Sequence, residues 1–313
     1  LGPVGQKRSS DSSSRPSGKT TGASDACNQK VKLGAPRTQS AAPKAHHEPN
    51  DLRKRRKKMT NPSDQPRQNI DDELVRMLKY LRLGHLLSSW DETLDKARKG
   101  RYSSERLLKY IVEEEYRAKR ENARLVRRQR ANIPEMLEIE TFPFDKQPKL
   151  DRKRVMSIYD NFDYMTKQRG VVWLGPTGCG KTGLATAFLL QAIDRGYRGY
   201  FITFPELIQE LFQSMADRSD HKVFRRYLSY DCLVIDEIGY VEVEPAQVGQ
   251  FFTLMHKRHR RKTTIITSNL GFSEWGSFLK NSQLTSALND RLTSNSHVIN
   301  MKDCESLRGR IEE

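Results

Sequence analysis

Between residues 71 and 131 the hydrophobic residues recur every three or four positions, which predicts a region made only of helices. The first helix presents one apolar face, made of Leu74, Met77, Leu78 and Leu81. A second helix ends at Gly100 and carries Leu86, Leu87, Trp90 and Leu94. A third starts after the candidate N-cap Ser103 and runs to about residue 131, because Pro134 follows.

Downstream of residue 150, short apolar runs alternate with helical patterns, which predicts a parallel sheet covered by helices on both faces. Strands are expected at residues 171–174, 200–204, 232–235, 264–267 and 297–299. The fold class is therefore α/β, a doubly wound sheet preceded by a small helical domain. The expected segments are a tail over 1–68, the helical domain over 69–133, a linker over 134–150 and the α/β domain over 151–313.

Composition limits the class of protein. The chain has 313 residues, of which 36% are hydrophobic and 30% charged. Since no run approaches the roughly 18 apolar residues of a spanning helix, no membrane partner is expected. Four scattered cysteines show neither metal-ligand spacing nor a disulfide framework, which favours a reducing, cytoplasmic location.

The formal net charge of +16 is unevenly distributed. Residues 1–58 hold 14 basic and 4 acidic residues and so carry +10 of it. This segment is rich in Ser, Pro and Gly, and we expect it to be disordered. Its basic run at 53–58 could bind nucleic acid non-specifically, but a solvated tail is the simpler interpretation. It could also be non-native sequence, because Met59 would make a reasonable start.

Residues 175–182 match the phosphate-loop pattern G-x-x-x-x-G-K-[ST] at every fixed position. They are Gly175, Pro176, Thr177, Gly178, Cys179, Gly180, Lys181 and Thr182. The expected strand before them and helix after them supply the context that the motif needs. Backbone N–H groups would surround a polyphosphate, while Lys181 reaches the β- and γ-phosphates and Thr182 holds Mg²⁺. ATP and Mg²⁺ are the expected cofactors.

Polar residues at the ends of later strands complete a candidate catalytic set. Asp236 is expected to help hold Mg²⁺, and the adjacent Glu237 to polarise the attacking water. Asn269 follows the next strand and could sense the γ-phosphate, or could simply form a turn. Arg291 could reach the γ-phosphate of a neighbouring subunit or form a salt bridge with Asp290, and Arg308 leaves a similar choice open.

The order of these motifs resembles the AAA+ ATPases, and more narrowly the IstB-like ATP-binding proteins encoded with insertion-sequence transposases. The resemblance covers about residues 71–310 and includes the stretches 102–108, 113–122 and 127–134. The helicase loader DnaC shares the ATPase core. The resemblance implies that Asn269 is the first sensor, Arg291 a finger acting in trans and Arg308 the second sensor. The family usually has Gly-x-Ser-Tyr-Arg at the second sensor, whereas residues 304–308 read Cys-Glu-Ser-Leu-Arg.

Two basic clusters in the ordered region are candidate DNA contacts, since they would neutralise phosphates in a sequence-tolerant way. One occupies a face of the third helix and comprises Arg117, Arg120, Arg124, Arg127 and Arg128. The other precedes the fourth strand and comprises Lys257, Arg258, Arg260, Arg261 and Lys262. A subunit contact or a solvated charge run would explain the first cluster equally well, and a solvated helix end the second.

Four functions fit these features to different degrees. The leading one, implied by the resemblance, is an ATP-hydrolysing helper that forms homo-oligomers on duplex DNA, remodels it and recruits or activates a partner transposase. The runner-up is a DnaC-like helicase loader, with single-stranded DNA and a helicase as partners. A small-molecule P-loop kinase leaves Arg291 and the basic clusters without a role. Intact Lys181, Asp236 and Glu237 argue against a nucleotide switch with negligible turnover.

Overall fold

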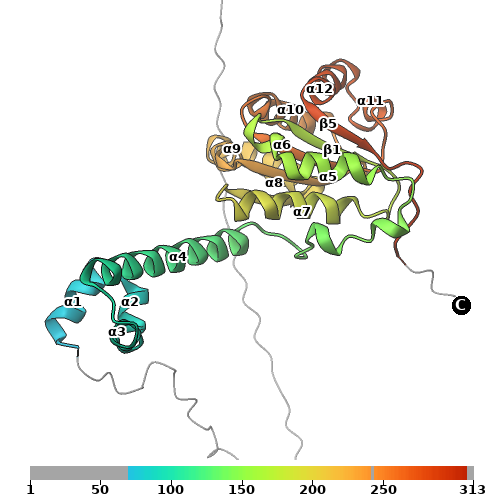
Figure 1. Cartoon of the computed structure of the whole chain (residues 1–313). Coiled ribbons are helices and arrows are strands. Elements are labelled where there is room, and N and C mark those ends of the chain that lie inside the picture. The colour runs from blue at the N-terminus through green and yellow to red at the C-terminus, as the bar shows by residue number, and fades with distance from the viewer. Residues whose placement is uncertain (1–69, 241–242, 309–313) are drawn as a thin grey trace, which may run out of the picture. The chain divides into compact units, whose positions relative to one another are not determined.

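The computed structural model describes residues 70–240 and 243–308 (Figure 1). At its centre lies a parallel five-stranded sheet in the order β2-β3-β4-β1-β5. The strands are β1 (Gly170–Leu174), β2 (Gly199–Thr203), β3 (Cys232–Ile238), β4 (Thr263–Ser268) and β5 (Ser296–Asn300). All five predicted strands, and the doubly wound α/β class, are confirmed.

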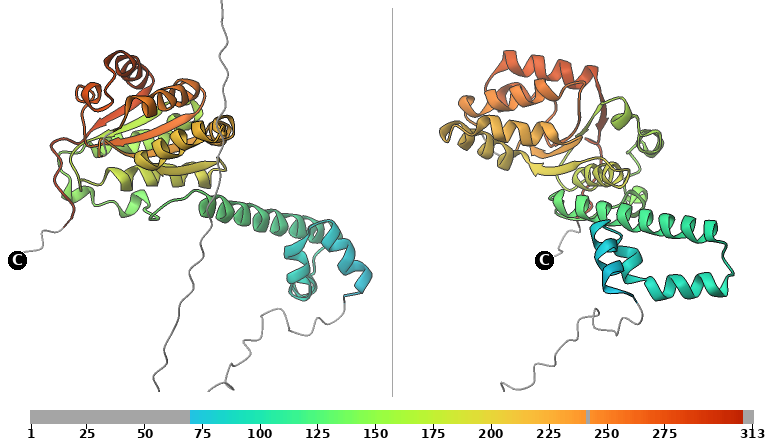
Figure 2. Two further views of the ribbon diagram at one scale, coloured as in Figure 1. Left: turned by 180° about the vertical axis from the view of Figure 1, so that it is seen from behind. Right: turned by 90° about the vertical axis from the view of Figure 1, so that its left-hand side faces the viewer.

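Helices cover both faces of the sheet (Figure 2). One face packs against α5 (Arg152–Asn161), α6 (Asp163–Thr166) and α7 (Lys181–Asp194). The other packs against α8 (Phe204–Ala216), α9 (Asp220–Ser229), α10 (Pro245–Arg258), α11 (Trp275–Phe278) and α12 (Ser282–Ser294). Alternate residues of a strand serve opposite cores, so Val171 and Trp173 belong to the first and Val172 to the second. Strands buried on both sides explain the continuous apolar runs.

The region before the sheet is helical, as predicted. Its helices are α1 (Asp72–Tyr80), α2 (Gly84–Ser88), α3 (Trp90–Lys99) and α4 (Ser104–Arg130). Ser103 is the N-cap of α4, and its hydroxyl accepts the amide of Arg106 at 3.2 Å. The buried carboxylate of Glu115 accepts the Leu86 amide at 3.0 Å and so ties α2 to α4.

The second predicted helix is broken in two at Ser89, contrary to the expectation of one continuous element. The hydroxyls of Ser88 and Ser89 each donate to the carbonyl of His85 at 2.8 Å. Such local side-chain bonds compete with the helical ladder, which accounts for the break.

Between α4 and α5 the chain forms only two short 3₁₀ helices, η1 (Ile139–Thr141) and η2 (Phe144–Lys146). The basic tail and Cys27 lie outside the described residues. Cys179, Cys232 and Cys304 are buried free thiols. A bilayer-spanning segment is absent from the described helices, none of which combines the necessary length with sufficiently low polarity.

Candidate functional site

The predicted phosphate loop connects the end of β1 to the start of α7. Gly178 and Gly180 have φ angles of +84° and +95°, a region that strongly favours glycine. A Cβ on Gly178 would lie 2.4 Å from the Ser306 Oγ, and one on Gly180 would lie 2.5 Å from the Phe142 ring. These glycines therefore serve two purposes, because the loop is closely covered by other segments as well as shaped for phosphate.

The Lys181 side chain is held at this loop by backbone carbonyl groups of the loop itself. Its Nζ donates to the carbonyl oxygens of Gly175 at 2.8 Å and Pro176 at 2.6 Å. Burial lowers the pKa of Lys181, which is 6% exposed. An anionic phosphate near Nζ would restore the preference for the charged form.

Asp236 and Thr182 meet at the end of β3, as the Mg²⁺ prediction requires. The Thr182 hydroxyl lies 3.1 Å from both carboxylate oxygens of Asp236, and the Thr267 hydroxyl donates to Oδ1. Burial raises the pKa of Asp236, although the hydrogen bonds from Thr267 and Thr182 oppose the shift. A buried carboxylate beside a hydroxyl is a donor set that fits Mg²⁺, which commonly takes its remaining ligands from water and substrate phosphates.

Glu237 lies on an irregularity in β3, where the register with β4 shifts between Ile235 and Ile238. Its φ of +64° is strained for a residue with a side chain, and such strain is concentrated at functional sites. The Glu237 amide donates to the Thr267 Oγ1 at 3.0 Å. Burial and the neighbouring Asp236 charge raise the pKa of Glu237. Thr267 therefore orients both carboxylate residues, a role that the sequence analysis did not assign.

Residues 301–308, here named the C-terminal strap, run along the phosphate loop. The strap is anchored by the Met301 amide on the Leu174 carbonyl at 2.6 Å and by the Leu307 amide on the Gly178 carbonyl at 2.9 Å. It brings Arg308 into a cavity of about 210 Å³ that also contains Lys181, Thr182 and Glu237. The strap thus places Arg308 within the nucleotide site, beside residues predicted to bind phosphate and activate water.

A second cavity of about 210 Å³ adjoins the phosphate loop at Gly180 and Gly183. Its lining is mostly apolar and includes Leu137, Phe142, Pro143 and Leu307. A flat heterocyclic base suits such a slot. Sequence analysis missed this cavity because its lining comes from a linker that has no hydrophobic periodicity. The feature that could have indicated it is the aromatic pair Phe142 and Phe144 on either side of Pro143.

The Asn269 side chain lies against the chain just after β3, the strand that carries Asp236 and Glu237, rather than in a solvent-facing turn. A Cβ on Gly239 would lie 2.4 Å from the Asn269 Oδ1, and this buried oxygen has no hydrogen-bond partner within the described structure. Tyr240, another residue that the sequence analysis missed, lines the cavity at the phosphate loop next to Thr177. Its hydroxyl lies 2.9 Å from the Thr177 Oγ1.

Arg291 lies far from its own phosphate loop. It lines a small cavity with Gly170, Thr264 and Ser296, which lie at the amino ends of their strands, whereas the loop follows the carboxyl end of β1. A five-residue strand spans about 17 Å. The Arg291 Nη1 donates to the Ala287 carbonyl at 2.7 Å, and no ion pair joins it to Asp290 among the described residues. This placement leaves Arg291 with no phosphate to contact within one subunit.

Comparison with known proteins agrees with ATP binding. The family described as IstB-like ATP binding protein matches residues 76–313, well over half of the chain. This chain belongs to the IstB-like family. The putative ATP-binding protein of insertion sequence IS21 from Pseudomonas aeruginosa is 30% identical over 74% of this chain and 86% of that protein. The corresponding protein of IS5376 from Geobacillus stearothermophilus is 34% identical over 58% of this chain and 71% of its own length.

Among solved structures, the DnaC helicase loader is similar, with a TM-score of 0.42 and 25% identity over 48% of this chain and 87% of that one. The sequence-based assignment of the chain to the IstB-like family of ATP-binding AAA+ proteins is confirmed.

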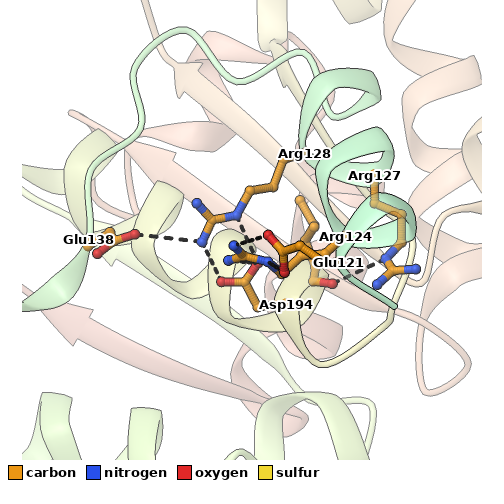
Figure 3. Close-up of polar contacts among 7 residues, drawn as sticks. Glu121, Arg124, Arg127, Arg128, Glu138 and Asp194 are labelled. Carbon is orange, nitrogen blue, oxygen red and sulfur yellow. Dashed lines mark hydrogen bonds and ion pairs between the residues drawn. The ribbon is translucent and has the colours of Figure 1, made fainter. Parts of the chain in front are cut away.

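The arginine face of α4 in this IstB-like chain is used largely within the molecule (Figure 3). Arg128 forms a bidentate pair with Asp194 at the end of α7 and an ion pair with Glu138. Arg124 pairs with Glu121 and Asp194, and the Arg127 Nε donates to the Ile193 carbonyl. These contacts join α4 to α7. Arg117, which pairs with Glu114 on the same helix at 2.7 Å, and Arg120 remain exposed and line a groove of about 680 Å³ that also contains Arg195.

The second basic cluster includes one residue that cannot contact DNA. Arg258 is 1% exposed, and its guanidinium donates to the Thr264 Oγ1 at 3.0 Å and to the Tyr227 carbonyl at 2.7 Å. The prediction of Arg258 as a DNA contact is therefore wrong, because this side chain pins α10 against the sheet. Lys262 pairs with Asp231, whereas Lys257, Arg260 and Arg261 are exposed.

We expect Asp236→Asn to raise the melting temperature of the nucleotide-free, Mg²⁺-free protein at pH 7.5. The substitution removes a carboxylate charge that burial disfavours, while the amide oxygen can still accept the threonine hydroxyls. A gain of about 2–4 °C corresponds to ~1 kcal/mol in a domain of this size. Thermal unfolding with and without MgATP provides the check. MgATP should raise the melting temperature of wild type more than ATP with a chelator does, and Asp236→Asn should lose that difference. If Mg²⁺ still raises the melting temperature of the ATP-bound variant, Asp236 is not a ligand of the ion.

Proposed function

We propose that this IstB-like protein is an ATP-hydrolysing helper of transposition that forms homo-oligomers on duplex target DNA, remodels it and recruits or activates a partner transposase. The observation that carries the proposal is the division of the catalytic set between two edges of the sheet. Lys181, Asp236, Glu237 and Arg308 surround the phosphate loop, whereas Arg291 lies at the opposite edge. Such a site is complete only when a second subunit contributes its arginine.

In this proposal the chain's own residues perform most of the work of phosphoryl transfer, which depends on positioning and charge stabilisation. The loop amides and Lys181 bind the phosphates, and Glu237 orients and polarises a water opposite the leaving group. Asn269 supports that water through its Oδ1, which lacks a partner within the described residues, or the γ-phosphate through its Nδ2, the only donor of the side chain. When bound, Mg²⁺ held by Thr182 and Asp236 neutralises phosphate charge. The apolar slot beside Gly180 accepts the adenine base.

The relatives' names support the link to DNA, since those proteins are ATP-binding proteins of insertion sequences. We assign the DNA contacts to the exposed basic residues and exclude Arg258. They comprise Arg117 and Arg120 on α4, and Lys257, Arg260 and Arg261 near the end of α10. Arg124, Arg127 and Arg128 instead hold α4 on α7. Lys262 is paired with Asp231 and only 33% exposed, whereas Arg117 stays 68% exposed although it pairs with Glu114. A cytoplasmic location remains part of this proposal.

We expect the double variant Arg117→Gln/Arg120→Gln to weaken duplex binding and to flatten its salt dependence. Each lost phosphate contact should reduce the slope of log K against log salt by about 0.9, so two contacts give about 1.8. Fluorescence anisotropy with labelled duplex between low and moderate salt measures this slope. The control Arg98→Gln/Lys99→Gln removes the same charge from an exposed part of α3 and should leave the slope unchanged.

The same titration distinguishes the alternatives. If the salt slope is unchanged for the α4 variant but falls for Arg260→Gln/Arg261→Gln, the duplex contacts only the basic segment that follows α10. Tighter binding of single strands than of duplex by the wild-type protein would instead favour the helicase-loader function.

A further inference from the structure

Gln147 directly follows η2 and is 2% exposed, and its side chain bonds only to backbone groups of two distant segments. Its Nε2 donates to the Glu305 carbonyl at 2.6 Å and to the Cys179 carbonyl at 3.3 Å. Its Oε1 accepts the Glu305 amide at 3.1 Å. One buried amide therefore joins the phosphate loop to the C-terminal strap.

These bonds fall at the part of the strap that determines where Arg308 lies. The strap is fixed at its start by Met301 and near its end by Leu307, and Glu305 lies between these two anchors. Arg308 follows Leu307 directly and enters the phosphate cavity beside Lys181 and Glu237. Because the Arg308 side chain is long and exposed, its position depends on the backbone that carries it.

We propose that Gln147 is a positioning residue that holds the C-terminal strap so that Arg308 meets the terminal phosphate of ATP. The inference rests on the proposed ATP site and adds a residue from the linker between α4 and α5. The same linker lines the apolar slot through Leu137 and Phe142. The apolar slot, the phosphate loop and the strap that carries Arg308 are thus all contacted by one segment outside the recognised motifs.

A purely structural role would also explain a buried amide with satisfied hydrogen bonds. The partners of Gln147 argue for more, because every side-chain bond ends on the phosphate loop or on the strap that delivers Arg308. A general loss of stability would lower the affinity for all nucleotides alike. A misplaced Arg308 would lower the affinity for ATP more than that for ADP, since only ATP carries the phosphate that Arg308 is assigned to contact.

The test compares wild type with Gln147→Met, Arg308→Ala and the double variant in the full chain. Methionine keeps the length and volume of the side chain but removes its hydrogen bonds. We expect Gln147→Met to weaken binding of a non-hydrolysable ATP analogue about tenfold, the effect of losing one charge-assisted hydrogen bond. ADP affinity should change less than about twofold. The double variant should bind the analogue no more weakly than Arg308→Ala alone, because both substitutions remove the same contact.

The other outcomes decide against the inference. Equal loss of ATP analogue and ADP, or multiplicative effects in the double variant, would show that Gln147 acts only structurally. If Gln147→Met fails to fold, Gln147→Asn keeps an amide in the buried site but shortens the side chain by one methylene, which weakens the bridge between Cys179 and Glu305, and must show the same preference for ADP. An Arg308→Ala protein that binds and hydrolyses ATP normally would contradict the proposed site itself, whereas a defective Arg308→Ala with a normal Gln147→Met would overturn only the role of Gln147.

Discussion

Glu237→Gln should leave ATP binding close to that of wild type and lower the rate of hydrolysis by about 10²–10⁴-fold, the usual contribution of a general base. The amide keeps the size of the side chain but cannot take a proton from water. Because hydrolysis then no longer ends the ATP-bound state, we expect the variant to accumulate as an assembled, DNA-bound complex. Single-turnover hydrolysis together with equilibrium binding of labelled ATP separates these effects.

Asp160→Asn supplies the matched control, since this carboxylate is exposed on α5 and lies outside the phosphate cavity. It should hydrolyse ATP at the wild-type rate. Normal turnover by Glu237→Gln would show that another group activates the water and that the strained backbone at Glu237 has a different purpose.

Arg291→Ala should reduce turnover by about 10³-fold or more, as expected for an arginine that stabilises transition-state charge. ATP binding to the isolated subunit should persist, because Arg291 lies at the opposite edge of the sheet from the phosphate loop. Folding should be little affected, since the Arg291 side chain donates a local hydrogen bond to the Ala287 carbonyl one helical turn earlier.

A mixing experiment separates a trans finger from a local role. Lys181→Ala lacks a working phosphate site but carries an intact Arg291, so equal mixing with Arg291→Ala creates composite sites with both residues. If subunits exchange freely within a cyclic oligomer, about a quarter of the interfaces regain both residues, and activity should recover to that order. Mixtures as inactive as the separate variants would count against a finger supplied in trans.

Local sequence patterns predicted much of this structure. The five strands, the extent of α4 with its Ser103 cap, and the meeting of Thr182 with Asp236 all follow from periodicity and motif chemistry. Strand ends could be placed at one edge of the sheet because parallel strands share a direction. The two serines that break the second helix are visible in the sequence, but hydrophobic periodicity does not show that their hydroxyls compete with helical hydrogen bonds.

Features built from distant segments could not be predicted. Gln147 lies 158 residues from Glu305, and no periodic pattern connects them. Arg258 belongs to an obviously basic run, yet the fold buries it against carbonyl groups that only tertiary structure brings together. The sequence likewise does not show which α4 arginines pair with α7 and which stay exposed, because this depends on the position of Asp194 in the fold.

The ATPase rate without DNA, with duplex and with single strands, measured alongside light scattering, tests whether hydrolysis depends on assembly on duplex DNA. We predict that ATP drives assembly of the full chain and that duplex DNA accelerates hydrolysis more than single strands do. A rate independent of DNA from a protein that stays monomeric with ATP would contradict the account, because a lone subunit cannot bring Arg291 to its own phosphate loop.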